Sequence, residues 1–177
     1  MHLSKTTFIR GYDCPVRVQH AANNLPSSTQ DSEFLRYLAE GGYQFEFLVR
    51  HAFPGEVICS DVVDPVAAHD STIAGIRKLL SSGGGVLHEG TLLHGDCSAR
   101  IDMMRITSNG LQLCEIKAKS FDGPDRLSPL EAIVDGSEVI CGNRGVRSSW
   151  LRYVADIAFQ AWVAEGALRA SGLCNIT

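Results

Sequence analysis

Three charged residues within the stretch 99–120 have the types and spacing that metal-dependent chemistry uses: Asp102, Glu115 and Lys117. A turn-forming cluster at 107–110 (TSNG) separates two runs rich in apolar and β-branched residues, which predicts a β-hairpin. With these four residues as the loop, Asp102 falls directly opposite Glu115. Opposed residues share a face of the sheet with their Cβ atoms roughly 5 Å apart. Lys117, two positions after Glu115, shares that face.

Two opposed carboxylates repel each other unless a positive charge lies between them. A hard divalent cation is one solution, because Mg²⁺ typically takes one or two carboxylates together with waters and substrate phosphates. A neighbouring lysine could orient or deprotonate a water, or offset charge that develops on a phosphate. The alternative is a surface hairpin in which Lys117 simply bridges Asp102 and Glu115. Spacing alone leaves both interpretations open.

The spacing from Asp102 to residues 115–117 (EIK) resembles the D…ExK signature of the PD-(D/E)XK nuclease superfamily. Residues 3–15 (LSKTTFIRGYDCP) resemble the start of its RecB-like branch, in particular an uncharacterised bacterial group that usually carries a second, RNase H-like exonuclease region. Residues 153–163 (YVADIAFQAWV) resemble a late helix in that group and place Gln160 where the branch has a glutamine. The three motifs occur in the expected order over nearly the whole chain.

The resemblance implies a restriction-endonuclease-like α/β core, with a central mixed β-sheet flanked by helices. It also implies a deoxyribonuclease that depends on Mg²⁺ or Mn²⁺ and hydrolyses DNA phosphodiester bonds in repair, recombination or defence. Asp102 and Glu115 would hold the metal, and the backbone carbonyl of Ile116 would add a ligand. Lys117 would position or activate the attacking water, with support from Gln160. The alternative is a catalytically inactive nuclease-like module for DNA binding or assembly.

Glu89 is a further candidate metal ligand. The resemblance places a glutamate on the strand that precedes the Asp102 strand, and Glu89 stands there. It could complete a metal site, or it could be a solvated residue at a sheet edge, and both readings remain open. His88, His94 and Asp96 are better explained as polar residues at strand ends than as a metal cluster.

Composition predicts one globular domain over residues 1–177, with 45% hydrophobic and 20% charged residues. The sequence has neither an apolar run of membrane-spanning length nor the apolar core of a signal peptide, so we expect a cytoplasmic protein without a membrane partner. The formal net charge of −4 argues against tight, constitutive DNA binding by this chain alone.

The six cysteines form no C-x-x-C pair, which argues against a closed zinc site and favours reduced thiols. In some RecB-like nucleases a cysteine at the position of Cys14 joins three near the C-terminus to hold an iron–sulfur cluster. Here only Cys174 lies near the end, so we do not expect a cluster.

The elements that position these residues follow from periodicity and capping signals. Gln160 lies on one helical stripe with Tyr153, and it is predicted to face the sheet, whereas Phe159 and Trp162 are predicted to lie in the core. We expect helices at 4–12, 33–52 (broken or bent at Gly41-Gly42), 64–82 and 148–171, and strands at 57–59, 86–93, 100–106 and 111–120.

Residues 121–147 depart from the family pattern, in which a short loop leads to the glutamine helix. We interpret them as an insertion with a strand at 137–141, either a substrate-facing flap or an inert decoration. No segment corresponds to the RNase H-like region. The expected partners are therefore DNA and an exonuclease or helicase domain or subunit outside this chain.

Overall fold

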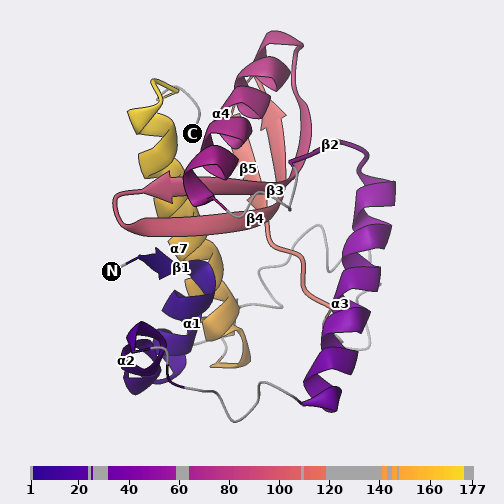
Figure 1. The fold of residues 1–177 in the computed structure, drawn as a ribbon. Helices are drawn as coiled ribbons and strands as arrows, with labels where there is room; N and C mark the ends of the chain where they lie inside the picture. Colours follow the sequence, from indigo (N-terminus) through magenta and orange to yellow (C-terminus); the bar gives the residue numbers. More distant parts are fainter. Residues whose placement is uncertain are drawn as a thin grey trace.

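The computed structural model describes residues 2–23, 25, 32–58, 64–108, 110–118, 141–142, 145–146 and 148–173. Most of the predicted insertion at 121–147, including most of its expected strand at 137–141, lies outside these residues. The described part is an α/β protein in which a five-stranded mixed sheet packs against helices (Figure 1). This confirms the predicted class of a mixed sheet flanked by helices. In the described ranges, no helix is long and apolar enough to cross a membrane.

The sheet has the strand order β1-β4-β3-β2, and β5 also pairs with β4. β3–β4 and β4–β5 are antiparallel, whereas β1 runs parallel to β4 and β2 parallel to β3. The strands are β1 (Leu3–Ser4), β2 (Glu56–Val57), β3 (Gly85–His94), β4 (Cys97–Thr107) and β5 (Gly110–Cys114).

The register of the β4–β5 hairpin is the predicted one, with Ile106 opposite Leu111. Two details of the prediction were wrong. The loop is shorter than four residues, because Thr107 pairs with Gly110. β5 also ends at Cys114 instead of continuing to residue 120. Beyond Cys114, the backbone N–H of Ile116 donates to the Asp102 side chain of β4 instead of a backbone carbonyl.

β1 and β5 occupy the same edge of β4. β3 pairs along the other edge from Cys97 to Ile106. On the edge of β4 opposite β3, β1 pairs with Cys97 and Ser98, and β5 pairs with residues 103–107. β1 and β5 run toward each other and both leave β4 before they meet. A gap in backbone pairing therefore opens beside residues 99–102.

The described residues form five helices: α1 (Lys5–Asp13), α2 (Val16–Ala22), α3 (Glu33–Ala52), α4 (Pro65–Ser81) and α7 (Ser148–Ala170). Two short strands, β6 (Cys141–Gly142) and β7 (Gly145–Val146), pair with each other. Capping set the starts of α1 and α4 as predicted: the Ser4 hydroxyl accepts from the Thr7 N–H, and Asp64 accepts from Val66.

α4 and α7 cover opposite faces of the sheet (Figure 1). Between them lies a core whose fully buried members include Ile76, Leu87, Leu92, Met104 and Val163. α1 joins this core by stacking Phe8 on Phe159 of α7, with ring centroids 4.4 Å apart. The placement of Phe159 in the core is confirmed. That of Trp162 was wrong, because its side chain is 51% exposed.

α3 is one continuous helix, so the chain is not broken at Gly41-Gly42, where a break or a bend was predicted. Each glycine costs a helix interior about 1 kcal/mol relative to alanine, too little to interrupt a capped helix of this length. The Ser32 hydroxyl accepts from Leu35 at the first turn. Within the described ranges α3 contributes no buried residue.

Candidate active site

The gap beside β4 brings four chain segments together. Asp102 projects from β4, and Glu115 follows the last residue of β5. Lys5 is the first residue of α1 and comes directly after β1. α7 adds Asp156 and Gln160. The β1–β4 pairing positions Lys5, because Ser4 lies beside Ser98 at the point where β1 ends.

One ammonium group contacts both carboxylates of the hairpin. The Lys5 Nζ lies 2.9 Å from the Oε2 of Glu115 and 3.1 Å from its Oε1. It also lies 3.7 Å from the Oδ1 of Asp102. The structure therefore confirms that the register brings Asp102 and Glu115 together, closely enough for a single cation to bridge them.

Asp102 is held in an environment that disfavours its charge. The Ile116 N–H donates to its Oδ2 at 2.8 Å, and only 14% of its side chain is exposed. Burial, with the charge of Glu115, raises the pKa of Asp102 to about 6 against the opposing effects of Lys5, the Ile116 hydrogen bond and Lys117. The nearby positive charges and the hydrogen bond therefore do not fully offset the cost of burying the ionised carboxylate of Asp102.

Glu115 shows the opposite behaviour although its side chain is only 8% exposed. Burial opposes its charge, but Lys5, Lys117 and Gln160 together outweigh burial and hold the pKa of Glu115 below its usual value. The Nε2 of Gln160 donates to its Oε2 at 2.7 Å, and Lys117 bonds to its Oε1. Glu115 is therefore ionised at neutral pH.

Lys117 lies between two carboxylates. Besides Glu115, its Nζ contacts the Oδ2 of Asp156 at 3.4 Å. Burial alone would lower the pKa of Lys117, but the hydrogen bond and charge of Glu115, with Asp156 and Asp102, raise it. Lys117 is consequently an ammonium ion at neutral pH, which suits charge stabilisation better than proton abstraction.

Gln160 faces the sheet as predicted and is fully buried. Its Nε2 donates to Asp156 at 2.9 Å as well as to Glu115, so it links α7 to the hairpin. Its Oε1 has no hydrogen-bond partner among the described residues. A buried amide oxygen of this kind is costly unless a water or another donor satisfies it.

Glu89 is buried but engaged elsewhere. Its Oε1 accepts from Arg50 of α3 at 2.7 Å, and its Oε2 lies 3.1 Å from Arg100 of β4. Its φ of 57° interrupts the β3–β4 pairing at this position. Two guanidinium groups already neutralise Glu89, so nothing in this arrangement requires a metal at its carboxylate.

The other sequence candidates have ordinary local contacts. His88 is buried, with its Nε2 2.8 Å from the Phe53 carbonyl oxygen. His94 lies edge-on to Trp162 at a centroid distance of 4.9 Å. Cys14 is a free thiol, whereas Cys174 lies outside the described residues. The part of the chain that the structure describes contains no cluster of three or more His, Cys, Asp or Glu side chains arranged to hold a metal.

The donor chemistry nevertheless fits a hard cation held by Asp102 and Glu115. Both groups offer oxygen atoms, which Mg²⁺ and Mn²⁺ prefer, and Mg²⁺ commonly takes only one or two protein carboxylates. The structure fixes the N–H side of Ile116 against Asp102. The role of the Ile116 carbonyl oxygen as a third metal ligand stays a prediction.

Sequence reasoning missed Lys5 and the role of Asp156. The only signal for Lys5 was its place inside the N-terminal motif 3–15, and a two-residue β1 is too short to predict from periodicity. Asp156 contacts Lys117 and Gln160, while Arg152 lies 3.4 Å from Asp13.

Comparison of the chain with protein-family models, with curated proteins and with solved structures gives no match.

Proposed function

We propose that this protein is a Mg²⁺- or Mn²⁺-dependent deoxyribonuclease that hydrolyses phosphodiester bonds. One observation carries the proposal: a single cation, the Lys5 ammonium, already spans Asp102 and Glu115, with Lys117 and Gln160 bonded to the same glutamate. This combination of paired carboxylates, a lysine and an amide is what the sequence resemblance implies for a nuclease site.

The charge balance of the cluster supports a divalent cation and a phosphate. Asp102, Glu115 and Asp156 supply three carboxylates against the two ammonium groups of Lys5 and Lys117, which leaves one net negative charge when all five are ionised. A divalent cation would reverse this to one positive charge. A single phosphodiester group carries one negative charge and would neutralise it.

A divalent cation bound here would supply Lewis-acid polarisation of the phosphate and activation of a water. Lys117 would hold the attacking water or stabilise the negative charge that grows on the phosphate oxygens. Gln160 would fix the orientation of Glu115 from α7. In the hydrolysis a water oxygen bonds to phosphorus, the bond to the leaving oxygen breaks, and the water protons pass to solvent and to that oxygen.

The test is cleavage of linear and circular DNA, single- and double-stranded, with Mg²⁺ or Mn²⁺. Asp102→Ala and Lys117→Ala should abolish cleavage, while Lys78→Ala, which removes an exposed cation paired with Glu56, should not. Circular dichroism would confirm that each variant is folded. Full activity in either site variant would disprove the assignment.

The second candidate is an inactive nuclease-like module that binds DNA or assembles with a partner. It is favoured by the same ion pairs, because Lys5 and Lys117 stabilise the carboxylates without any metal. This candidate predicts DNA or partner binding with no metal-dependent cleavage. In either case we propose a cytoplasmic role in DNA repair, recombination or defence, with an exonuclease or helicase component as the expected partner.

A further inference from the structure

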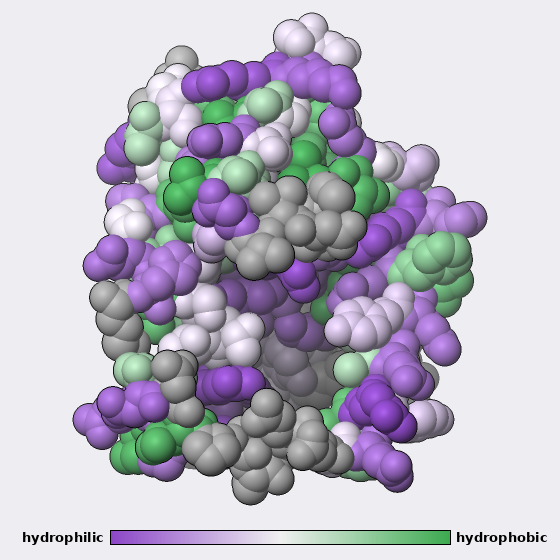
Figure 2. All heavy atoms as spheres, viewed as in Figure 1, coloured by the Kyte–Doolittle hydropathy of each residue, from purple (hydrophilic) through white to green (hydrophobic). Residues whose placement is uncertain are grey.

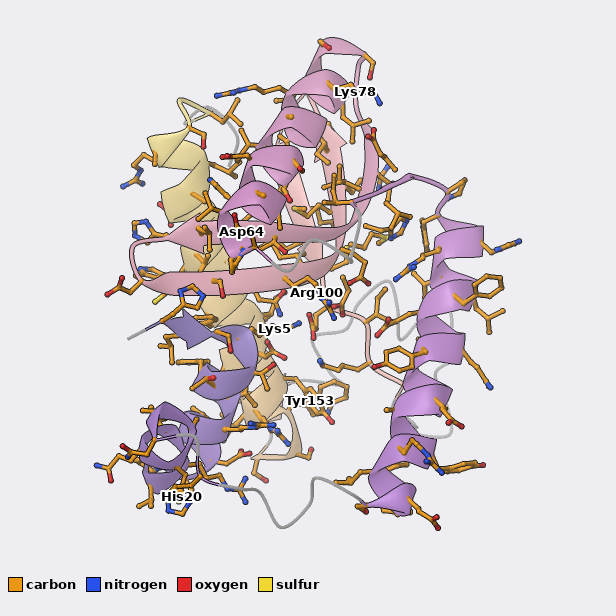
Figure 3. The ribbon with its side chains drawn as sticks, in the orientation of Figure 1. Lys5, His20, Asp64, Lys78, Arg100 and Tyr153 are labelled. Atoms are coloured by element: carbon orange, nitrogen blue, oxygen red, sulfur yellow. The ribbon has the colours of Figure 1, made fainter. Side chains whose placement is uncertain are left out.

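A cavity of about 440 Å³ adjoins the carboxylate cluster. It lies between α1 and α7 and shares Lys5, Lys117 and Asp156 with the cluster. Figure 2 shows this face of the molecule hollowed in its middle, with hydrophilic residues on the visible floor. Lys5 from α1 and Tyr153 from α7 extend toward the middle of the same face (Figure 3).

Positive side chains predominate in the lining of this cavity, although the carboxylates of Asp102 and Glu115 lie next to Lys5 and Lys117. Lys5, Arg10, Lys117 and Arg152 contribute four positive charges, and Asp156 contributes the one negative charge among the lining residues. This excess contrasts with the net charge of −4 for the whole chain. Local concentration of one sign of charge in a concave site attracts ligands of the opposite sign.

Two of these cations have capacity for an added anion. Arg10 is exposed and makes no side-chain ion pair with the described residues. The Arg152 side chain is 56% exposed, and its one ion pair with the described residues joins it to Asp13 at 3.4 Å. Guanidinium groups bind phosphate through two parallel hydrogen bonds, whereas the two lysines act as point charges. The lining therefore offers the donors that a phosphate group needs.

We propose that this cavity binds a phosphate group of the nucleic-acid strand next to the bond that is cut. This inference rests on the proposed function, because it takes the cluster of Asp102 and Glu115 as the place of cleavage. Arg10 and Arg152 would hold the phosphate, and Lys5 and Lys117 would connect the two sites. The phosphate is either a terminal monoester or an internal diester of the strand.

The test is binding of fluorescein-labelled 12-nucleotide DNA, measured by anisotropy in EDTA at fixed low salt, to the wild type and to an Arg10→Ala/Arg152→Ala variant. Removing two charge-assisted contacts should weaken binding at least about tenfold. Lys78→Ala/Arg105→Ala is the charge-matched control, because both cations are exposed and neither lines the cavity. Asp13→Asn should strengthen binding, because it frees Arg152.

Oligonucleotides with a 5′-phosphate, a 3′-phosphate or neither separate the two sources of phosphate. Tighter binding of one phosphorylated end that the Arg10→Ala/Arg152→Ala variant loses would assign a terminal monoester. Equal binding of all three, weakened equally by the double variant, would assign an internal diester. If the wild type binds none of them, or if the Arg10→Ala/Arg152→Ala variant binds as the Lys78→Ala/Arg105→Ala control does, the inference is wrong.

Metal binding measured on the same proteins separates this failure from failure of the proposed function. The Arg10→Ala/Arg152→Ala variant should bind Mn²⁺ as the wild type does, because neither arginine contacts Asp102 or Glu115. If the wild type binds DNA but no Mn²⁺, the phosphate-binding proposal stands and the proposed nuclease function is wrong. If the wild type binds Mn²⁺ but the double variant loses no DNA affinity, the phosphate-binding proposal is wrong and the proposed nuclease function stands.

Discussion

Asp102→Asn should make the metal-free protein more stable at pH 8 while destroying its metal site. The raised pKa of Asp102, about 6 against the ordinary value of 3.8, means that folding disfavours its ionised form. Asparagine has no charge to bury, and its side-chain oxygen can still accept the hydrogen bond from the Ile116 N–H. The sign of this effect is unusual for a substitution that removes a buried ion pair.

The magnitude follows from linkage. A pKa difference of about 2 units corresponds to about 3 kcal/mol, at 1.36 kcal/mol per unit. The asparagine N–H₂ must find a new partner, so we expect a gain of about 1 to 3 kcal/mol. For a chain of this size, 1 kcal/mol raises Tm by about 2 to 4 °C. The penalty in the wild type is absent below about pH 4, grows as the pH rises from the unfolded pKa of 3.8 to the folded pKa of about 6, and is complete above it.

The assay is urea denaturation of wild type and Asp102→Asn in EDTA at pH 4, 6 and 8. The gap between the two free energies of unfolding should widen with pH. Glu115→Gln is the matched control and should lower stability, because Glu115 has a lowered pKa. Its stabilising contribution is present above the unfolded pKa of 4.5 and is lost as the pH falls through the lower folded value. An Asp102→Asn protein less stable than wild type at pH 8 would refute the reasoning.

Three further predictions follow from individual contacts. Lys5→Met should tighten Mn²⁺ binding measured by calorimetry, because the ammonium that competes for both carboxylates is gone; unchanged or weaker binding would contradict the bridging role of Lys5. Glu89→Gln should leave Mn²⁺ affinity unchanged but lower the free energy of unfolding, since Arg50 and Arg100 lose their counter-charge; a loss of metal binding would instead restore Glu89 as a ligand. Gly84→Ala should destabilise the fold by about 2 to 4 kcal/mol in urea denaturation, because φ is +114° and a Cβ would lie 2.6 Å from the Ile106 oxygen; an unchanged midpoint would show that the turn before β3 adapts.

The sequence was most informative where local chemistry decides the structure. The turn residues 107–110 and the alternation on either side fixed the register that places Asp102 beside Glu115. Ser4 and Asp64 marked two helix starts by their capping bonds. These features depend on residues close together in the chain, so a pattern in the sequence predicts them.

Features that depend on distant segments were missed. The contact between Lys5 and Glu115 joins residues 110 positions apart and depends on the short parallel pairing of β1 with β4. Beyond the end of β5 at Cys114, the Ile116 N–H donates to the Asp102 side chain. Trp162 was expected in the core from its type alone, but it lies half-exposed against His94. None of these contacts has a local sequence signature.

The most direct test of the account is titration of Mn²⁺ into the wild type and into the Asp102→Asn/Glu115→Gln variant by calorimetry, without DNA and then with a short duplex. The paired-carboxylate account predicts that the wild type binds Mn²⁺ in at least one of these conditions, and that the double variant binds none in either. If the wild type binds no Mn²⁺ even with the duplex, or if the double variant binds as tightly as the wild type, then Asp102 and Glu115 do not form a metal site and the proposed nuclease function falls.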